Sequence, residues 1–316
     1  MNTTKTLTFA TANLFNFLKP PDAFYEFSNI YGQEEWQAKC QWTKSQINKL
    51  DADIIGLQEV FSIEAVQQLL AECGFPYFVT VDKPKSESDY IYSRPVVALA
   101  SKYPILHAEA VKPLKEPVKA YQIELPEFSR KPIHAVIKVP TVGEVAVYVC
   151  HLKSQRATEP TLKGEESQLL GQWLSSQLRG WESMMLRLYM DKQYQKSPRP
   201  TALLGDMNQP LTSDITGLLT QRADEEGEAL VLTDSWLVYK HAAISPARAA
   251  THYHFSKGNV LDYVILSQEF QPDSQRSIAE VSRYLVQDQH LINPIYDRDK
   301  QASDHAFVAV GTQFIV

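Results

Sequence analysis

The sequence predicts an α/β protein built on a mixed β-sheet, and three observations support this class. Short apolar runs typical of buried strands alternate with stretches in which apolar residues recur at helical spacing. Residues 144–152 have apolar side chains on both alternating faces, as expected for an interior strand of a layered sheet. Several polar side chains stand where predicted strands begin or end. We expect these polar residues to mark the functional site.

Length and composition are those of a globular protein. The chain has 316 residues, of which 44% are hydrophobic and 22% charged. This length fits two domains or one large α/β unit, and we see no linker, repeat or low-complexity tract. The net charge of −6 argues against a large basic nucleic-acid surface but is compatible with a local basic cleft.

The cysteine content and the hydropathy of the sequence give an expectation for the cellular location of the protein. The three cysteines are scattered, without zinc-type spacing or a disulfide framework. The N-terminus shows no signal-peptide apolar region, and no apolar run is long enough to span a bilayer. We therefore expect a cytoplasmic protein, unless a signal precedes this sequence, and a monomer by default.

The first predicted strand covers residues 6–14. Its alternation places Asn13 at the C-terminal end, on the face that carries Leu7 and Phe9. Asparagine is disfavoured in strands, so a strand-ending turn is the alternative interpretation of Asn13 alone.

A helix over residues 36–50 is followed by a second buried strand over residues 53–59. Glu59 ends this strand, and alternation places it on the face of Ile55 and Leu57. A carboxylate on an apolar face is costly unless it is paired or bound to a metal. Glu59 is therefore a candidate metal ligand.

The next region contains a helix and two further strands. Residues 62–74 predict a capped helix stopped by glycine, and residues 77–81 and 95–100 predict strands. Arg94 enters the second of these strands and is either an exposed loop arginine or a phosphate ligand. Residues 112–138 carry an excess of three positive charges, which fits a solvated face or an anion-steering rim.

The strand at residues 144–152 ends near a basic cluster. His151 closes one face of it and is followed by Lys153 and Arg156. A single histidine at such a place is often a hydrogen-bonded core residue. The neighbouring cations instead suit an anionic ligand, so we treat His151 and Lys153 as candidate site residues.

Residues 164–195 predict a long helix, and we interpret its apolar stripe as packing. The stripe consists of Leu169, Leu170, Trp173, Leu174, Leu178, Trp181, Met185 and Leu188. After it, residues 202–204 predict a buried strand that leads to Asp206 and Asn208. Two residues apart in extended backbone, these side chains point the same way and suit a phosphate and its cation. A β-turn is the alternative.

The C-terminal part contributes three more polar segments. Residues 251–254 include two histidines, but without further ligands we favour a loop there. Residues 261–267 predict a strand that begins with Asp262, a buried carboxylate that needs a partner. Asp304 and His305 directly precede a final buried strand over residues 306–310.

If the last two strands run antiparallel to the others, all these polar groups meet at one edge. Oxygen ligands dominate the set, which suits Mg²⁺ or Mn²⁺ and argues against zinc. Asp262 is placed to hold His305 in one tautomer. No serine or cysteine nucleophile motif appears, so water is the expected nucleophile. The residues predict a hydrolase of phosphate esters.

The same residues carry a family resemblance. Six short motifs occur in the order found in the endonuclease/exonuclease/phosphatase superfamily and span residues 6–312. They are Thr11-Ala12-Asn13-Leu14, Gly56-Leu57-Gln58-Glu59-Val60, His151-Leu152-Lys153-Ser154, Gly205-Asp206-Met207-Asn208, Leu261-Asp262-Tyr263 and Ser303-Asp304-His305. The resemblance implies a single domain over residues 1–316, folded as a four-layer α/β sandwich of two mixed sheets face to face with helices outside. It also implies that Glu59, Asn13 and Asp304 hold Mg²⁺ on the scissile phosphate.

The resemblance further implies catalytic roles. Asp206 aligns or activates the attacking water, and Asn208 orients the phosphate. His305, paired with Asp262, handles protons, and His151 stabilises the charge on the pentacoordinate phosphorus. Arg94 resembles the residue that other members place on the phosphate.

Two features depart from the pattern. Residues 157–200 form a longer and more helical segment than in the compact nucleases, and the loops that insert into damaged DNA are not recognisable. We therefore predict a Mg²⁺-dependent phosphodiesterase, first a nuclease of limited sequence preference acting on nucleic acid. The alternatives are a phosphatase or phosphodiesterase for a lipid headgroup or small phosphorylated metabolite, and an inactive scaffold that binds phosphorylated partners.

Overall fold

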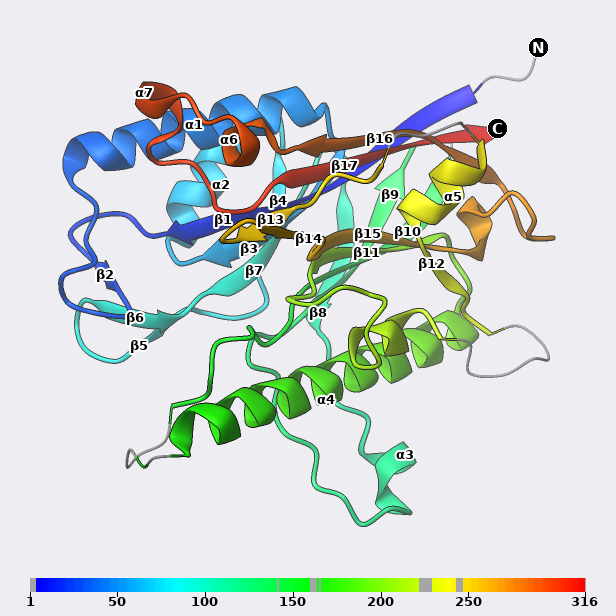
Figure 1. Cartoon of the computed structure of the whole chain (residues 1–316). Helices are drawn as coiled ribbons and strands as arrows, with labels where there is room; N and C mark the ends of the chain where they lie inside the picture. Colours follow the sequence, from blue (N-terminus) through cyan, green and yellow to red (C-terminus); the bar gives the residue numbers. More distant parts are fainter. Residues whose placement is uncertain are drawn as a thin grey trace.

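The structure, a computed structural model, describes residues 4–140, 142–159, 164, 166–221, 229–242 and 247–315 (Figure 1). Two six-stranded sheets pack face to face, and helices lie on their outer faces. This arrangement confirms the predicted four-layer α/β sandwich.

The first sheet contains the N-terminal and C-terminal strands. Its order is β16 (Ala279–Gln287), β17 (Phe307–Ile315), β1 (Thr4–Phe17), β3 (Ile54–Val60), β7 (Val96–Ser101) and β4 (Tyr77–Val79). β1 is parallel to β3 and antiparallel to β17. The sheet is therefore mixed, as expected.

The second sheet is formed by the middle of the chain. Its order is β12 (Leu232–Asp234), β15 (Asp262–Ser267), β11 (Thr201–Asp206), β10 (Gly143–His151), β9 (Ile133–Val139) and β8 (Ile105–Ala110). β10 is parallel to β11, and β15 is antiparallel to β11. Strands β15 and β17, which begin at or just after predicted site residues, therefore run antiparallel to β11 and β1, which carry site residues at their C-terminal ends. All these residues consequently lie at one edge of the sandwich.

Helices cover the two outer faces. Those of the first sheet are α1 (Gln33–Leu50) and α2 (Ile63–Glu72), and α4 (Ser167–Lys196) covers the second sheet. The shorter helical segments are α3 (Lys115–Lys119), η1 (Thr216–Leu219), α5 (Ser235–Ala242), η2 (Gln268–Phe270), α6 (Gln289–Ile292) and α7 (Tyr296–Asp299). Among the described residues, no helix has the length and apolar character needed to cross a membrane.

Side-chain alternation divides the interior into three cores. The core between the sheets includes Leu7, Phe9, Val149, Leu204 and Val264 from strands of both sheets. The alternate residues of these strands, with the helices, form the two outer cores. Each sheet is buried on both faces, which explains why its strands read as nearly continuous apolar runs.

The apolar stripe of α4 departs from the prediction in its first half. Leu169, Leu170, Trp173 and Leu174 are 72%, 54%, 58% and 44% exposed, whereas Met185 is buried as expected. The first turns instead direct polar groups inward, because the backbone of the preceding loop needs hydrogen-bond partners. The Ser175 hydroxyl, for example, donates to the carbonyl of Arg156.

Two small sheets lie outside the sandwich. One contains β2 (Ala23–Phe24), β6 (Ile91–Arg94) and β5 (Lys85–Ser86), and the other is a hairpin of β13 (His252–His254) and β14 (Lys257–Asn259). The expectation of a loop at residues 251–254 is therefore wrong. The hairpin register and a bridge from His252 to His305 turn this segment into a strand at the predicted site.

Candidate active site

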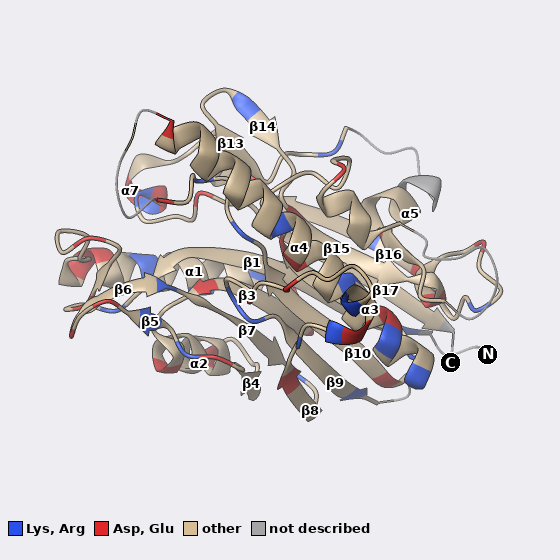
Figure 2. Cartoon of the chain, turned by 90° about the horizontal axis from the view of Figure 1, so that it is seen from below, with Lys and Arg blue, Asp and Glu red and all other residues tan. Residues whose placement is uncertain are grey.

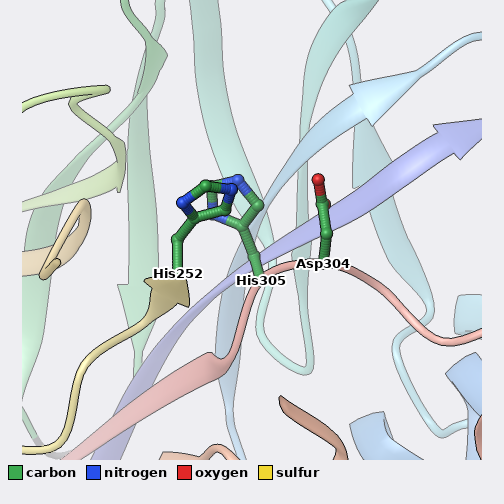
Figure 3. Close-up of side chains that lie close together, drawn as sticks. All are labelled: His252, Asp304 and His305. Atoms are coloured by element: carbon green, nitrogen blue, oxygen red, sulfur yellow. The ribbon is translucent and has the colours of Figure 1, made fainter. Parts of the chain in front are cut away.

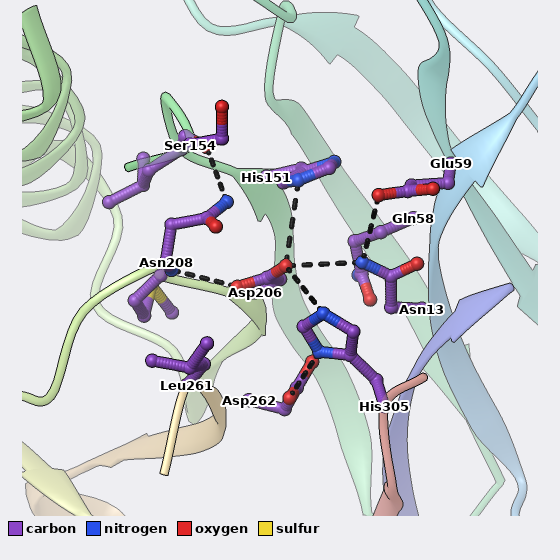
Figure 4. A network of polar contacts seen from close by, with 12 residues as sticks. Asn13, Gln58, Glu59, His151, Ser154, Asp206, Asn208, Leu261, Asp262 and His305 are labelled. Atoms are coloured by element: carbon purple, nitrogen blue, oxygen red, sulfur yellow. Dashed lines mark hydrogen bonds and ion pairs between the residues drawn. The ribbon is translucent and has the colours of Figure 1, made fainter. Parts of the chain in front are cut away.

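The Asp206 carboxylate lies at the centre of the polar residues (Figure 4). Its Oδ2 is 3.1 Å from Asn13 Nδ2, 3.5 Å from His151 Nε2 and 3.8 Å from His305 Nε2. Its Oδ1 accepts the backbone N–H of Asn208 at 2.7 Å. Three side chains from three different strands or strand starts thus converge on one oxygen atom.

Burial changes the proton affinity of Asp206. The side chain is 1% exposed, and it stands opposite Asp262 in the pairing of β11 with β15. Burial, opposed by His305 and reinforced by Asp262, raises the pKa of Asp206 to about 7. A carboxylate with this pKa can accept a proton near neutral pH.

The two histidines differ in charge. Burial works against the charged form of His305, but the carboxylates of Asp262 and Asp206 outweigh it and raise its pKa well above the ordinary value. Burial, together with Arg130, lowers the pKa of His151 well below the ordinary value. Near neutral pH, His305 is therefore a cation and His151 is neutral.

Glu59 reaches the site in a way that strand alternation does not predict. Ile55 and Leu57 face the α1–α2 side, so regular alternation would turn Glu59 away from Asn13. Instead Glu59 has a left-handed backbone with φ 60°, and the pairing of β3 shifts register there. Its Oε1 accepts from Asn13 Nδ2 at 3.4 Å. The predicted face was wrong, and the bulge restores the contact.

Asn13, Glu59 and Asp304 fit a hard divalent cation. Oε2 of Glu59 accepts the N–H of Asn16 at 2.8 Å, which fixes the carboxylate. Asp304 Oδ1 is buried and has no hydrogen-bond partner among the described residues. A buried, unpartnered carboxylate oxygen is costly unless a cation binds it. The donor set of two carboxylates and an amide is the type that Mg²⁺ and Mn²⁺ bind.

His252 adds a group that sequence reasoning passed over. Ligand atoms of His252, Asp304 and His305 lie within 4.8 Å of one another (Figure 3). The ring centroids of the two histidines are 4.8 Å apart. The signal in the sequence was the pair of histidines one residue apart. The pair can be assigned to the site only from the bridge between His252 and His305, which lies 53 residues later in the chain.

Asn208 lies in a turn, so the prediction that it points the same way as Asp206 through extended backbone is wrong. Its φ is 54°, and its N–H bonds to the side chain of Asp206, as in an Asx-turn. Its Nδ2 donates to the carbonyl of Leu152 at 2.9 Å. The turn brings Asn208 to the loop that follows His151, beside the cluster.

The structure does not bring Arg94 into this cluster. Arg94 is exposed at the end of β6. A hydrogen bond from Ser93 and the charge of Lys85 lower the pKa of Glu87, and the charge of Arg94 contributes a smaller part of this effect. Lys153 lies two residues beyond the end of β10 at His151, but its Nζ donates to the carbonyl of Arg156 at 3.3 Å. Contact of either residue with phosphate stays a prediction.

Two buried groups of α4 hold the loop after His151. Glu182 accepts the N–H groups of Ser129 and Lys153, both at 2.6 Å. Arg179 Nη1 donates to the carbonyls of Lys153 and Ser154 at 2.8 and 3.2 Å. These residues were not predicted, because their helical positions look like ordinary solvated charges in the sequence.

Lys39 of α1 is a further residue that sequence reasoning missed. It is 1% exposed, and its Nζ lies 5.4 Å from the ring centroid of Phe15 and 5.3 Å from that of Tyr31. Burial lowers its pKa to about 8, while Glu59 and Asp304 act in the opposite direction. A positive charge thus stands behind the two candidate metal-binding carboxylates.

A comparison with protein families identifies a family that covers most of the chain. The model described as "Endonuclease/Exonuclease/phosphatase family" matches residues 29–305. No protein with a curated description matches the chain.

Solved structures share the fold at low sequence identity. The human Nocturnin catalytic domain with a bound sulfate anion is 16% identical, with 99% of this chain and 96% of that one covered and a TM-score of 0.64. ANGEL2, described as a 2′,3′-cyclic phosphatase, is 13% identical, with 99% and 96% covered and a TM-score of 0.60. The Bacteroides thetaiotaomicron mannosyl-6-phosphatase Bt3783 is 18% identical, with 96% and 98% covered and a TM-score of 0.54.

Proposed function

Because the chain belongs to the endonuclease/exonuclease/phosphatase family, whose members hydrolyse phosphoric esters, we propose that it is a Mg²⁺-dependent phosphodiesterase that cleaves nucleic acid. The convergence of Asn13, His151 and His305 on Oδ2 of Asp206 is the observation that carries this proposal. A buried carboxylate ringed by nitrogen groups suits a reaction in which a water molecule attacks an anionic ester.

Glu59, Asn13 and Asp304 would hold the cation, with Mn²⁺ as the alternative ion. When bound, a divalent cation supplies positive charge that offsets the charge on the phosphate oxygens. The unpartnered Oδ1 of Asp304 and the fixed Glu59 carboxylate support this assignment.

In the proposed reaction, separate residues of the chain transfer protons, stabilise charge and orient the phosphate. Asp206 takes a proton from the attacking water, whose oxygen forms the new bond to phosphorus as the bond to the leaving oxygen breaks. His305, held as a cation by Asp262, supplies a proton at Nε2 to the leaving oxygen. His151 donates a hydrogen bond from its neutral ring to the developing charge, and Asn208 orients the phosphate.

A phospholipid headgroup is the second candidate substrate, because the exposed half of α4 favours it. Leu169, Leu170, Trp173 and Leu174 form an apolar surface, and residues 167–178 carry no charged side chain, as Figure 2 shows. A small phosphorylated metabolite stays a third possibility through the shared fold of the mannosyl-6-phosphatase. The presence of every acid and histidine of the site argues against an inactive scaffold. We also retain a single domain, a monomeric state and a cytoplasmic location as parts of the proposal.

Hydrolysis assays test these candidates. Bis-p-nitrophenyl phosphate, single-stranded DNA and RNA, sphingomyelin vesicles and mannose 6-phosphate should be compared with Mg²⁺, with Mn²⁺ and with EDTA. We expect turnover of the first two classes that EDTA abolishes. Turnover confined to vesicles would identify a phospholipid headgroup as the substrate in place of nucleic acid. Turnover confined to mannose 6-phosphate would identify a small phosphorylated metabolite instead. No turnover of any substrate by the metal-loaded protein would contradict the enzyme assignment.

A further inference from the structure

A groove of about 940 Å³ opens from the catalytic residues. His305 and Asn208 lie at its catalytic end. One wall is formed by the first turns of α4, with Gln168 and Gln172, and the other by the β13–β14 hairpin. The groove is much larger than a phosphate group needs, so it has room for the parts of a substrate that adjoin the scissile bond.

Amide side chains dominate the lining of this groove. They are Gln155, Gln168, Gln172, Asn208, Gln209 and Asn259. Amides offer both donors and acceptors without charge, and they therefore match the edges of nucleobases and the hydroxyl groups of sugars. Gln168 and Gln172 are one helical turn apart, so their side chains share an edge of α4.

The charged lining is sparse. Apart from His305 at the catalytic end, Arg156 and Lys257 are the cations among the described residues that line the groove, and Glu159 is the acid. Arg156 already pairs with Glu159 at 3.0 Å. A duplex is bound chiefly through many phosphate contacts by lysine and arginine, and this groove does not offer such a track.

The hairpin wall supplies flat rings. His252 and His254 line the groove, and the ring of Phe255, next in the chain, packs against His254 with centroids 4.7 Å apart. Phe255 is 91% exposed and adopts a left-handed φ of 53° at the hairpin turn. Rings of this kind stack with unpaired bases irrespective of sequence.

We propose that the groove binds the unpaired nucleotides next to the scissile phosphate, so that the substrate is single-stranded rather than duplex nucleic acid. Amides of α4 hydrogen-bond to bases and sugars, and the rings of the hairpin stack with bases. Unpaired bases expose the edges that amides read, whereas a duplex keeps them paired. The inference rests on the proposed phosphodiesterase function and adds the substrate class.

A fluorescently labelled 12-nucleotide strand, alone and annealed to its complement, tests this inference with the full-length protein and Mg²⁺. Bis-p-nitrophenyl phosphate serves as the small reference substrate. The Gln168→Ala/Gln172→Ala double variant is compared with Gln177→Ala, an exposed glutamine of α4 that does not line the groove. Each variant is scored by the ratio of kcat/KM for the strand to kcat/KM for the small ester.

We expect the single strand to be cleaved at least 10-fold more efficiently than the duplex. The double variant should lower the ratio about 10-fold through a higher KM, as expected for two lost hydrogen bonds, and Gln177→Ala should leave it unchanged. With Lys257 and, if it leaves Glu159, Arg156 as the cations that can neutralise phosphates, the logarithm of 1/KM should fall with the logarithm of salt concentration at a slope no steeper than about −1.4.

The contrary results separate the two proposals. Equal cleavage of duplex and strand, or a double variant with the wild-type ratio, overturns the groove assignment and leaves the phosphodiesterase intact. Turnover of the small ester without cleavage of either nucleic acid overturns both the groove assignment and the nucleic-acid substrate. Loss of turnover on every substrate overturns the phosphodiesterase itself.

Discussion

Nδ1 of His305 lies 2.8 Å from Oδ2 of Asp262, and both side chains are buried. This bond fixes the ring so that the opposite nitrogen, Nε2, faces Asp206 at 3.8 Å. A histidine cation therefore stands between two carboxylates that belong to neighbouring antiparallel strands. We therefore expect Asp262 to act on the proposed reaction through His305, because its Oδ2 is bonded to the ring.

Replacement of Asp262 by asparagine removes the charge that orients His305. We expect the Asp262→Asn variant to lose about 10²- to 10⁴-fold in kcat with little change in KM, since the interaction matters in the transition state. Steady-state kinetics with bis-p-nitrophenyl phosphate measures both constants. Asp53→Asn, in a carboxylate that pairs with Lys102 away from the site, is the matched control. A fall in KM alone, or an unchanged kcat, would remove the orienting role from Asp262.

Glu59 should determine metal affinity. The Glu59→Gln variant keeps the shape of the side chain but loses a charged ligand, so we expect Mn²⁺ affinity to fall at least 10-fold. Isothermal titration of the purified protein with Mn²⁺ measures the dissociation constant without reference to turnover. Glu64→Gln, an exposed carboxylate of α2, should bind Mn²⁺ as the wild type does. Equal affinity in the Glu59 variant would show that another group holds the ion.

Regular strands made much of this site predictable. Asn13, His151, Asp206 and Asp262 share faces with residues of the inter-sheet core, as their alternation predicts. Alternation applies while the backbone stays extended, because successive side chains then point to opposite faces. The fold class followed from the same patterns and from the order of the six motifs.

The site residues that the sequence pattern misplaced or missed fall into two groups, one explained by backbone conformation and the other by the topology of the fold. Glu59 and Asn208 leave the extended conformation through positive φ angles of 60° and 54°, which a two-residue periodicity cannot represent. His252 meets His305, and Lys39 packs against the ring of Phe15, through contacts between elements distant in sequence. Their local sequence patterns are those of a loop and a solvated helix. The prediction that the apolar stripe of α4 packs inward was wrong in its first half for a related reason. Polar side chains of the helix instead face inward and donate hydrogen bonds to backbone carbonyls of the loop behind it.

His134 provides a pH test of stability away from the site. It stacks on Tyr148 with ring centroids 4.6 Å apart, and burial lowers its pKa to about 4. Between pH 6.5 and about 4 the unfolded chain binds a proton that the folded chain excludes, so stability falls as pH falls.

We expect His134 to account for a loss of about 2 kcal/mol between pH 7 and pH 5. Urea unfolding of the wild type and of His134→Gln at both pH values measures this loss, since the variant lacks the titrating group. The free energy of unfolding should drop by that much less in the variant. Parallel losses in the two proteins would show that His134 remains protonatable in the fold.

Substitution of Gly205 tests how closely β10 and β11 approach each other beside Asp206, the proposed catalytic carboxylate. A Cβ at this position would lie 2.2 Å from the carbonyl oxygen of Cys150, a backbone atom that cannot move without shifting β10. Because His151 and Asp206 are the next paired residues along these strands, a shift of β10 also displaces the site. We therefore expect Gly205→Ala to lower the free energy of unfolding by about 1–3 kcal/mol and to reduce kcat.

Gly180→Ala is the matched control for this substitution. A Cβ there would meet Ile215 Cγ2 at an ordinary 3.7 Å, and the residue lies inside α4. Alanine should stabilise the helix by up to about 1 kcal/mol and leave kcat unchanged. Urea unfolding and turnover of bis-p-nitrophenyl phosphate are measured for both variants. If Gly205→Ala were as stable and active as Gly180→Ala, the close strand approach would not be what positions His151 against Asp206.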